Sequence, residues 1–135
     1  MKNENREHCK YIALELEAYA EGRVYRCPEC STHVQDNVLF CECGEQVDLI
    51  EGEWEQCSLY DYLEDVLDIE YTIQSDRQTV KGVRLLVAFG GPNIYVDTIK
   101  KAVTLYWWTE YAEYALDTDV CDDLDEIAQE HWDMG

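Results

Sequence analysis

Positive charge is scarce in this chain of 135 residues, and it is unevenly distributed. Ten Lys and Arg stand against thirty Asp and Glu, which gives a formal net charge of −20 at pH 7. No basic residue occurs between Arg26 and Arg77, and none follows Lys101. Because nucleic-acid-binding proteins draw most of their affinity from Lys and Arg at phosphates, this deficit argues against direct nucleic-acid binding.

Long apolar runs are also missing from the sequence. No stretch approaches the roughly 20 apolar residues of a membrane span, and residues 1–22 lack the apolar core of a signal peptide. We therefore expect a cytoplasmic protein without membrane contact. The hydrophobic share of 47%, with ten Tyr and four Trp, nevertheless excludes a disordered acidic tail.

Hydrophobic periodicity divides the chain into three parts. Residues 1–22 contain one amphipathic helix over 6–21, and Gly22 is a suitable residue to end it. Residues 23–50 read as short strands around two cysteine turns. Residues 51–135 carry five basic and twenty acidic residues, so this part holds most of the negative charge. We expect it to form an acidic α+β domain.

Two acidic helices are predicted in this last part. The first spans residues 58–68, with Ser58 as its N-cap. The second begins near Asp119 as N-cap, and its apolar positions recur at helical spacing, so this stripe is expected to lie on a sheet. The stripe consists of Val120, Leu124, Ile127 and His131.

Strand-like segments lie between the two helices. β-branched and aromatic residues are concentrated in runs that short turn segments separate. These runs cover residues 69–75, 81–89, 93–98 and 102–108, with 110–116 as a candidate fifth strand. The predicted fold is therefore α+β: an N-terminal helix, a small zinc-ribbon-like β insert, and an antiparallel meander of four to five strands packed with two acidic helices.

Four of the seven cysteines form a C-x2-C pair and a C-x-C pair separated by ten residues: Cys27, Cys30, Cys41 and Cys43. Two tight turns of this kind supply four soft ligands for a tetrahedral Zn²⁺, and four protein ligands make the site structural. The segments "YRCPEC" and "LFCECGEQV" resemble the cysteine turns of the zinc ribbon family over residues 24–48. The second turn is one residue shorter than in zinc ribbons, which leaves His33 as an alternative fourth ligand.

Other interpretations of the cysteines remain open at this point. The four could be ordinary buried thiols or could form disulfides, although disulfides are rare in the cytoplasm. The remaining three, Cys9, Cys57 and Cys121, are interpreted as small buried hydrophobic residues.

Catalytic motifs are not recognisable in the sequence. His8 lies near the N-terminus, His33 lies in the cysteine segment, and His131 falls on the apolar stripe of the last helix. The string "AFGGPN" lacks the G-x-x-x-x-G-K pattern of a phosphate loop and is interpreted as a hairpin turn. We therefore expect a protein that is not an enzyme.

A longer segment, "LLVAFGGPNIYVDT" followed by "LYWW" and an acidic helix, is similar to a module of small uncharacterised acidic proteins from phages and mobile elements in bacteria. The resemblance covers residues 58–133. It implies an accessory protein in the cytoplasm of a bacterial host. In charge and context the chain also resembles the anti-CRISPR and antirestriction proteins that act as DNA mimics.

The acidic helix faces give the main functional hypothesis. A nucleic-acid mimic would bind a basic host-defence protein, such as a CRISPR effector or restriction enzyme, and inhibit it without catalysis. The alternatives are a zinc-ribbon adaptor or regulatory module without mimicry, a solvated helix face, and a halophilic surface. The candidate partner-binding residues are Asp61, Glu64, Asp65, Asp68, Asp122, Asp123, Asp125, Glu126, Glu130 and Asp133.

Overall fold

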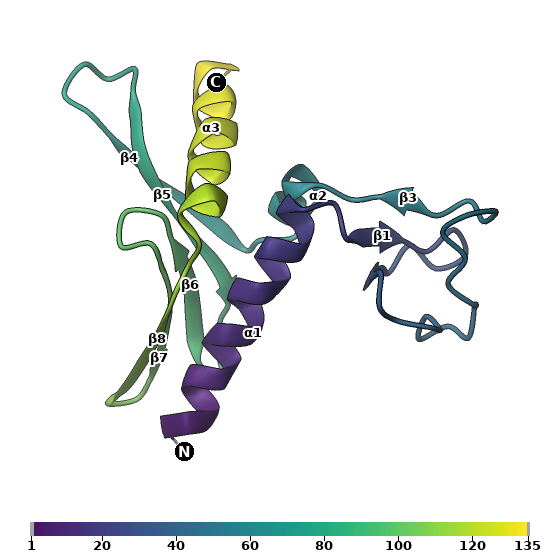
Figure 1. The fold of residues 1–135 in the computed structure, drawn as a ribbon. Helices are drawn as coiled ribbons and strands as arrows, with labels where there is room; N and C mark the ends of the chain where they lie inside the picture. Colours follow the sequence, from purple (N-terminus) through teal and green to yellow (C-terminus); the bar gives the residue numbers. More distant parts are fainter. Residues whose placement is uncertain (1, 135) are drawn as a thin grey trace.

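The computed structural model describes residues 2–134 and has the predicted α+β fold (Figure 1). Its helices are α1 (Lys2–Ala20), α2 (Leu59–Glu64) and α3 (Thr118–Met134). A small sheet contains β1 (Val24–Arg26), β2 (His33–Gln35) and β3 (Glu55–Gln56). The main sheet contains β4 (Asp68–Ile73), β5 (Val80–Ala88), β6 (Asn93–Asp97), β7 (Ala102–Trp107) and β8 (Glu110–Ala115).

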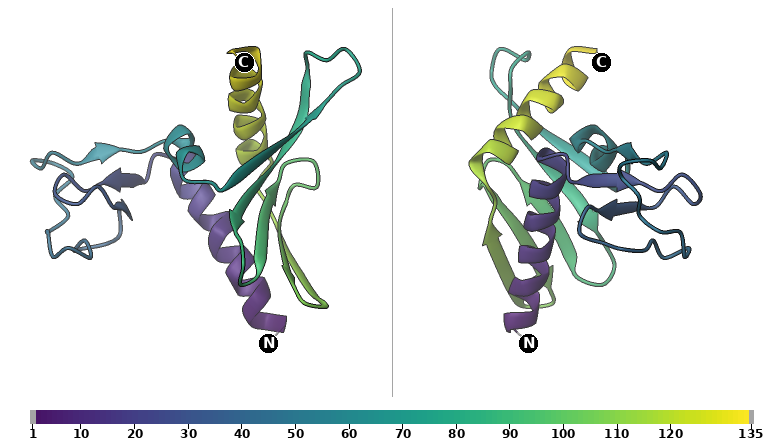
Figure 2. Two further views of the ribbon diagram at one scale, coloured as in Figure 1. Left: turned by 180° about the vertical axis from the view of Figure 1, so that it is seen from behind. Right: turned by 45° about the vertical axis from the view of Figure 1, so that its right-hand side comes forward.

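The main sheet is the predicted antiparallel meander, and the candidate fifth strand is part of it. Its spatial order, β4-β5-β6-β7-β8, follows the chain, and every neighbouring pair is antiparallel. Helix α1 packs on β7 and β8, and α3 packs on β5. Both helices lie on the same face of the sheet (Figures 1 and 2).

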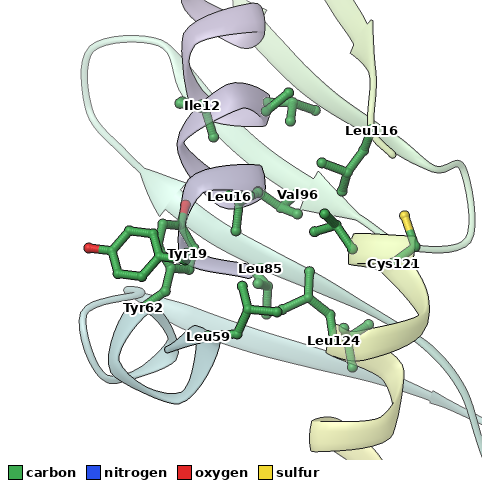
Figure 3. Close-up of a cluster of buried hydrophobic side chains, with 14 of the residues drawn as sticks. Ile12, Leu16, Tyr19, Leu59, Tyr62, Leu85, Val96, Leu116, Cys121 and Leu124 are labelled. Atoms are coloured by element: carbon green, nitrogen blue, oxygen red, sulfur yellow. The ribbon is translucent and has the colours of Figure 1, made fainter. Parts of the chain in front are cut away.

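The core lies between this helical layer and the sheet. Strand alternation turns Leu85 and Val96 inward, where both are completely buried against Leu16 of α1 and Leu124 of α3 (Figure 3). Truncation of such a leucine to alanine typically costs about 2–5 kcal/mol of stability. The helices are therefore positioned by apolar contacts, while most of their carboxylates stay on the outer side.

Helix α2 is shorter than predicted. The periodicity indicated a helix over residues 58–68, but the helix ends at Glu64 and Asp68 is the first residue of β4. The backbone N–H of Leu67 donates to the carbonyl of Leu86, 2.8 Å away, so the chain has already joined the sheet there. Pairing with β5 therefore overrides the helical pattern, and the side chain of Leu67 is 61% exposed.

Helix α3 differs from the prediction at both ends. Its first turn is capped by Asp117, not Asp119, because the Asp117 carboxylate accepts the Asp119 backbone N–H at 2.8 Å. The stripe is buried at Val120, Leu124 and Ile127, but His131 is exposed. In the last turn Trp132 faces the β4–β5 hairpin instead: its ring centroid lies 5.7 Å from that of Tyr71. The position of this hairpin, rather than helical periodicity, decides which side chain of the last turn contacts the sheet.

The small sheet extends from the end of α1, away from the main sheet (Figures 1 and 2). Gly22 ends α1 with φ +73°, and an added Cβ there would lie 2.3 Å from the side chain of Gln56. In the small sheet β1 is central, with β2 on one side and β3 on the other. Strand β3 lies beyond residue 50, so residues 55–56 complete the sheet that begins in the predicted segment 23–50.

Candidate functional site

The four cysteines of the two predicted turns come together in space. Their Sγ atoms all lie within 4.8 Å of one another. The Sγ atoms of Cys27 and Cys43 are 3.8 Å apart, and those of Cys30 and Cys41 are 3.4 Å apart. A tetrahedron with metal–sulfur bonds of about 2.3 Å places its sulfurs about 3.8 Å apart. All four cysteines are free, so the cluster fits a metal ion and is not a pair of disulfides.

Two backbone turns hold the cysteines in this arrangement. In the first turn the backbone N–H of Ser31 donates to the carbonyl of Cys27 at 2.9 Å. In the second turn the N–H of Gly44 donates to the carbonyl of Cys41, also at 2.9 Å, and Gly44 has φ +94°. Glycine adopts this backbone conformation without strain, which allows the short C-x-C turn to close. The C-x-C turn therefore places the Sγ atoms of both Cys41 and Cys43 in the cluster, although only one residue separates them.

His33 does not belong to the cluster, which consists of the four cysteines alone among the described residues. Its Nδ1 lies 2.7 Å from the hydroxyl of Tyr19 on α1. The alternative in which His33 replaces a cysteine ligand is thus not the arrangement seen. Instead, this histidine connects the small sheet to the helical layer.

The thiols of the cluster have strongly different proton affinities. A hydrogen bond with the Thr32 hydroxyl, 3.1 Å from Sγ, is the main reason that the pKa of Cys30 falls to about 6. The backbone N–H of Glu45 lowers the pKa of Cys43, but desolvation and the neighbouring sulfurs outweigh it and raise this pKa to about 12. Four thiolates this close need a cation between them. The cluster therefore has the chemistry of a closed, four-ligand metal site.

The other three cysteines are buried in the core, as the sequence suggested: Cys9, Cys57 and Cys121. Desolvation raises the pKa of Cys9 to about 11 and that of Cys121 to about 11. Both thiols are thus protonated at neutral pH. They pack as small apolar side chains rather than as nucleophiles.

The carboxylates of α3 are mostly on its outer side. Asp122, Asp123, Glu126, Glu130 and Asp133 are exposed, as is Asp119 in the first turn. The structure records four ion pairs, which involve Arg23, Arg26 and Arg84, and among residues 4–134 none of them reaches α3. The outer side of α3 therefore carries negative charge that no ion pair compensates.

Asp125 does not share this orientation, although the sequence placed it on the outer face. Its Oδ1 accepts a hydrogen bond from the Thr98 hydroxyl at 2.7 Å, and the side chain is half-buried. Desolvation, together with the nearby Asp122 carboxylate, raises the pKa of Asp125. This residue attaches α3 to the β6–β7 connection and is not available to a partner.

The predicted acidic residues around α2 also separate. Asp61 caps the helix by accepting the Ser58 N–H at 2.7 Å, and it forms an ion pair with Arg26 at 2.9 Å. Hydrogen bonding to the Ser58 backbone is the largest cause that lowers its pKa. Glu64 and Asp65 are exposed, whereas Asp68 lies on β4. Helix α2 therefore contributes fewer free carboxylates than predicted, because Asp61 is paired and Asp68 belongs to β4.

A groove of about 300 Å³ nevertheless runs between α2 and α3. Its acidic lining comes from α3, through Asp123, Glu126 and Glu130, and Tyr60 of α2 lines the other side. The Tyr60 hydroxyl donates to the Glu130 carboxylate. Tyr60 was not among the predicted site residues, because residues 60 and 130 meet only through the tertiary fold.

A second cleft, of about 460 Å³, lies between α1 and the small sheet. Tyr19 and His33 line it together with the side chains of Tyr11, Val38 and Phe40. These three side chains are 62%, 37% and 59% exposed. No sequence pattern indicated this cleft, since its two sides are separate elements.

No protein-family model matches the chain, and neither a curated protein nor a solved structure matches it. Among the described helices, none is long and apolar enough to cross a membrane.

Proposed function

We propose that this protein is a non-catalytic inhibitor that binds the basic, nucleic-acid-binding surface of a bacterial host-defence protein, such as a CRISPR effector or restriction enzyme. The carboxylates of α3 would take the place of phosphates. The observation that carries the proposal is the outer side of α3, where Asp122, Asp123, Glu126 and Glu130 are exposed without ion-pair partners. Basic side chains of a partner would supply the missing cations.

The charge spacing along α3 supports this proposal. Its 17 residues span about 26 Å and contain six exposed carboxylates besides the inward Asp125, or one exposed charge per about 4.3 Å. B-DNA carries one charge per about 1.7 Å of axis. The exposed carboxylates of one helix therefore reach about 40% of the linear charge density of a duplex.

Stability alone does not favour this arrangement. Like charges four residues apart, as at Asp122 and Glu126 or Glu126 and Glu130, cost an isolated helix about 0.2–0.5 kcal/mol per pair. Asp133 adds a negative charge in the last turn, where the helix dipole already disfavours it. A helix that only needed to be solvated would gain from mixed charges. This loss of helix stability is consistent with selection of the acidic surface of α3 for binding a partner.

The proposed metal is Zn²⁺, in a structural role. Four cysteine ligands leave no open position for water or substrate, which distinguishes structural from catalytic zinc sites. The ion would be held by the four clustered cysteines and would fix the two cysteine turns: Cys27, Cys30, Cys41 and Cys43. Zinc would supply no chemistry to the partner and would act only through folding.

The inhibitor proposal is tested by neutralising part of α3. Replacing Asp122 and Asp123 by Asn and Glu126 by Gln removes three charges and leaves the buried stripe intact. The three exposed acids Glu7, Glu51 and Glu53, changed to Gln, give a control with the same net charge. Each variant would be immobilised and exposed to a bacterial lysate, and bound proteins would be eluted in steps of rising salt.

The parent should retain a nucleic-acid-binding protein that elutes with salt and is displaced by excess DNA or RNA. Exposed charge pairs contribute up to about 1 kcal/mol each, so the α3 variant should bind about five- to a hundredfold more weakly. The control variant should bind like the parent. Equal retention by the α3 variant at low salt, with no displacement by nucleic acid, would refute the proposal.

The cleft between α1 and the small sheet favours a second candidate, a zinc-ribbon adaptor. Its exposed apolar side chains, including Tyr11 and Phe40, suit a peptide partner. Binding there would be nearly insensitive to salt, because burial of apolar surface is not screened. Loss of partner binding in a Phe40→Ser variant, with the α3 variant unaffected, would select this candidate.

A further inference from the structure

The face of the main sheet opposite α1 and α3 carries a row of aromatic side chains. Within residues 2–134 neither helix covers this face (Figures 1 and 2). Tyr95 on β6, Tyr106 on β7 and Tyr111 on β8 form what we call the tyrosine row. Their ring centroids are 5.9 Å apart between Tyr95 and Tyr106, and 5.0 Å apart between Tyr106 and Tyr111. Tyr106 is 37% exposed and Tyr111 is 48% exposed, so the row is open to a partner.

Strand register explains why the row is continuous. Tyr106 on β7 is directly opposite Tyr111 on β8. Tyr95 on β6 is opposite Thr104, which lies two residues before Tyr106 on β7, so Tyr95 and Tyr106 are diagonal neighbours. Thr104 shares this outer face yet is only 1% exposed. Sequence alternation places each tyrosine on one face of its own strand, but only the register aligns the three.

Carboxylates lie at both ends of the row. On the β8 side the Tyr111 hydroxyl donates to the Glu113 carboxylate at 2.8 Å. On the β4 side the Glu70 carboxylate pairs with Arg84, with N–O distances of 2.6 and 2.7 Å. The row thus has a carboxylate at each end: Glu70 is already paired with Arg84, whereas no ion pair is recorded for Glu113 among residues 4–134.

The chain's own Arg84 shows which group this surface accommodates. Its guanidinium carbon lies 4.3 Å from the centroid of the Tyr95 ring, while the same guanidinium pairs with Glu70. A planar cation between an aromatic face and a carboxylate combines cation–π attraction with a charged hydrogen bond. Tyr106, Tyr111 and Glu113 repeat this combination on β7 and β8, and among residues 4–134 the structure records neither an ion pair nor a cation–π contact there.

We propose that Tyr106, Tyr111 and Glu113 form a binding site for an arginine side chain of a protein partner. The site is on the sheet face opposite α3, so it is independent of the proposed nucleic-acid mimicry. Aromatic rows on open sheets also stack nucleic-acid bases, but those sites add cations for the phosphates. Here Glu113 and the net charge of −20 oppose phosphate and favour a guanidinium.

The test uses the whole protein and a blocked Gly/Ser peptide with two arginines, with a lysine peptide of the same sequence as the comparison. Isothermal titration gives the affinities, and amide chemical shifts of isotope-labelled protein locate the site. Tyr111→Leu removes the aromatic ring, and Glu113→Gln removes the charge while keeping the shape. Thr72→Val, at an exposed outer position on β4, is the matched control.

The arginine peptide should bind more tightly than the lysine peptide and should shift amides of residues 104–113. Tyr111→Leu and Glu113→Gln should each weaken binding about two- to fivefold, the range expected for exposed cation–π and ion pairs. Thr72→Val and the triple α3 variant should retain it. Equal affinities for the two peptides would overturn the proposal. So would loss of binding only in the α3 variant, or displacement of the peptide by single-stranded RNA.

Discussion

The hydroxyl of Tyr19 lies 2.7 Å from Nδ1 of His33, and this hydrogen bond joins α1 to the small sheet that carries the cysteine cluster. The two rings also contact each other edge to face, with centroids 5.8 Å apart. On its other side the Tyr19 ring packs against Tyr62 of α2 at 5.2 Å. Burial raises the pKa of Tyr19, which keeps the hydroxyl protonated. One tyrosine of α1 therefore contacts both β2 and α2.

Replacement of Tyr19 by Phe should loosen this connection. The variant keeps the ring packing and loses the hydrogen bond, so the free energy of unfolding should fall by about 1 kcal/mol. Amide hydrogen exchange should accelerate most in residues 24–35. Tyr11→Phe, at a residue 62% exposed, is the control and should change neither quantity. Unchanged exchange in residues 24–35 would show that the hydrogen bond does not hold the small sheet.

Metal analysis should find about one zinc per chain in freshly purified, reduced protein. Cys30→Ser should lower this content and destabilise residues 24–48, because metal binding and folding of such segments are coupled. His33→Gln should keep the metal, since His33 lies outside the cluster. Mass spectrometry under native conditions measures the stoichiometry. Protein that folds normally and contains no metal would contradict the assignment.

Asp125→Asn should make the protein slightly more stable at neutral pH. The pKa of Asp125 is raised by desolvation, so its charged form destabilises the folded state. Asn still accepts a hydrogen bond from Thr98. Relief of the repulsion from Asp122, three residues away on the helix, should add about 0.2–0.5 kcal/mol.

The pH dependence of this effect has a defined sign. A carboxyl group with a raised folded-state pKa favours folding once it is protonated, so the advantage of Asp125→Asn should be full at pH 7. It should shrink as the pH falls through the folded-state pKa of Asp125. Urea unfolding of both proteins between pH 4 and 7 measures the difference, with Asp123→Asn as the exposed control. A constant difference across this range would count against the burial argument.

Gln129 should be important for the attachment of α3 to the β4–β5 hairpin. Its Oε1 accepts the backbone N–H of Val80 at 2.7 Å, and its Nε2 donates to the carbonyl of Gln78 at 2.8 Å. Gln129→Ala leaves the N–H of the buried Val80 without this partner and should cost about 1–3 kcal/mol. Glu126→Ala, an exposed position on the same helix, should cost less than 0.5 kcal/mol, about the usual limit for surface substitutions. Thermal unfolding of the two variants gives the comparison, and equal midpoints would refute the role of Gln129.

The main sheet and the cysteine cluster could be predicted from the sequence, because both depend on local patterns. Alternating β-branched and aromatic residues with short turns predict a meander, in which each strand pairs with its neighbour in the chain. The spacing of Cys27, Cys30, Cys41 and Cys43 likewise brings ligands together through two turns. In both cases the decisive contacts are close in the chain, so they leave a readable pattern.

Three features could not be predicted in this way, because they depend on contacts between elements: the end of α2, the orientation of Asp125 and the alignment of the tyrosine row. Helical periodicity continued to residue 68, but pairing with β5 offered the backbone of Leu67 a hydrogen bond to Leu86. Asp125 fits an acidic face by spacing, yet the position of Thr98 turns it inward. Each outcome depends on a partner from another element, and register and packing set that partner's position.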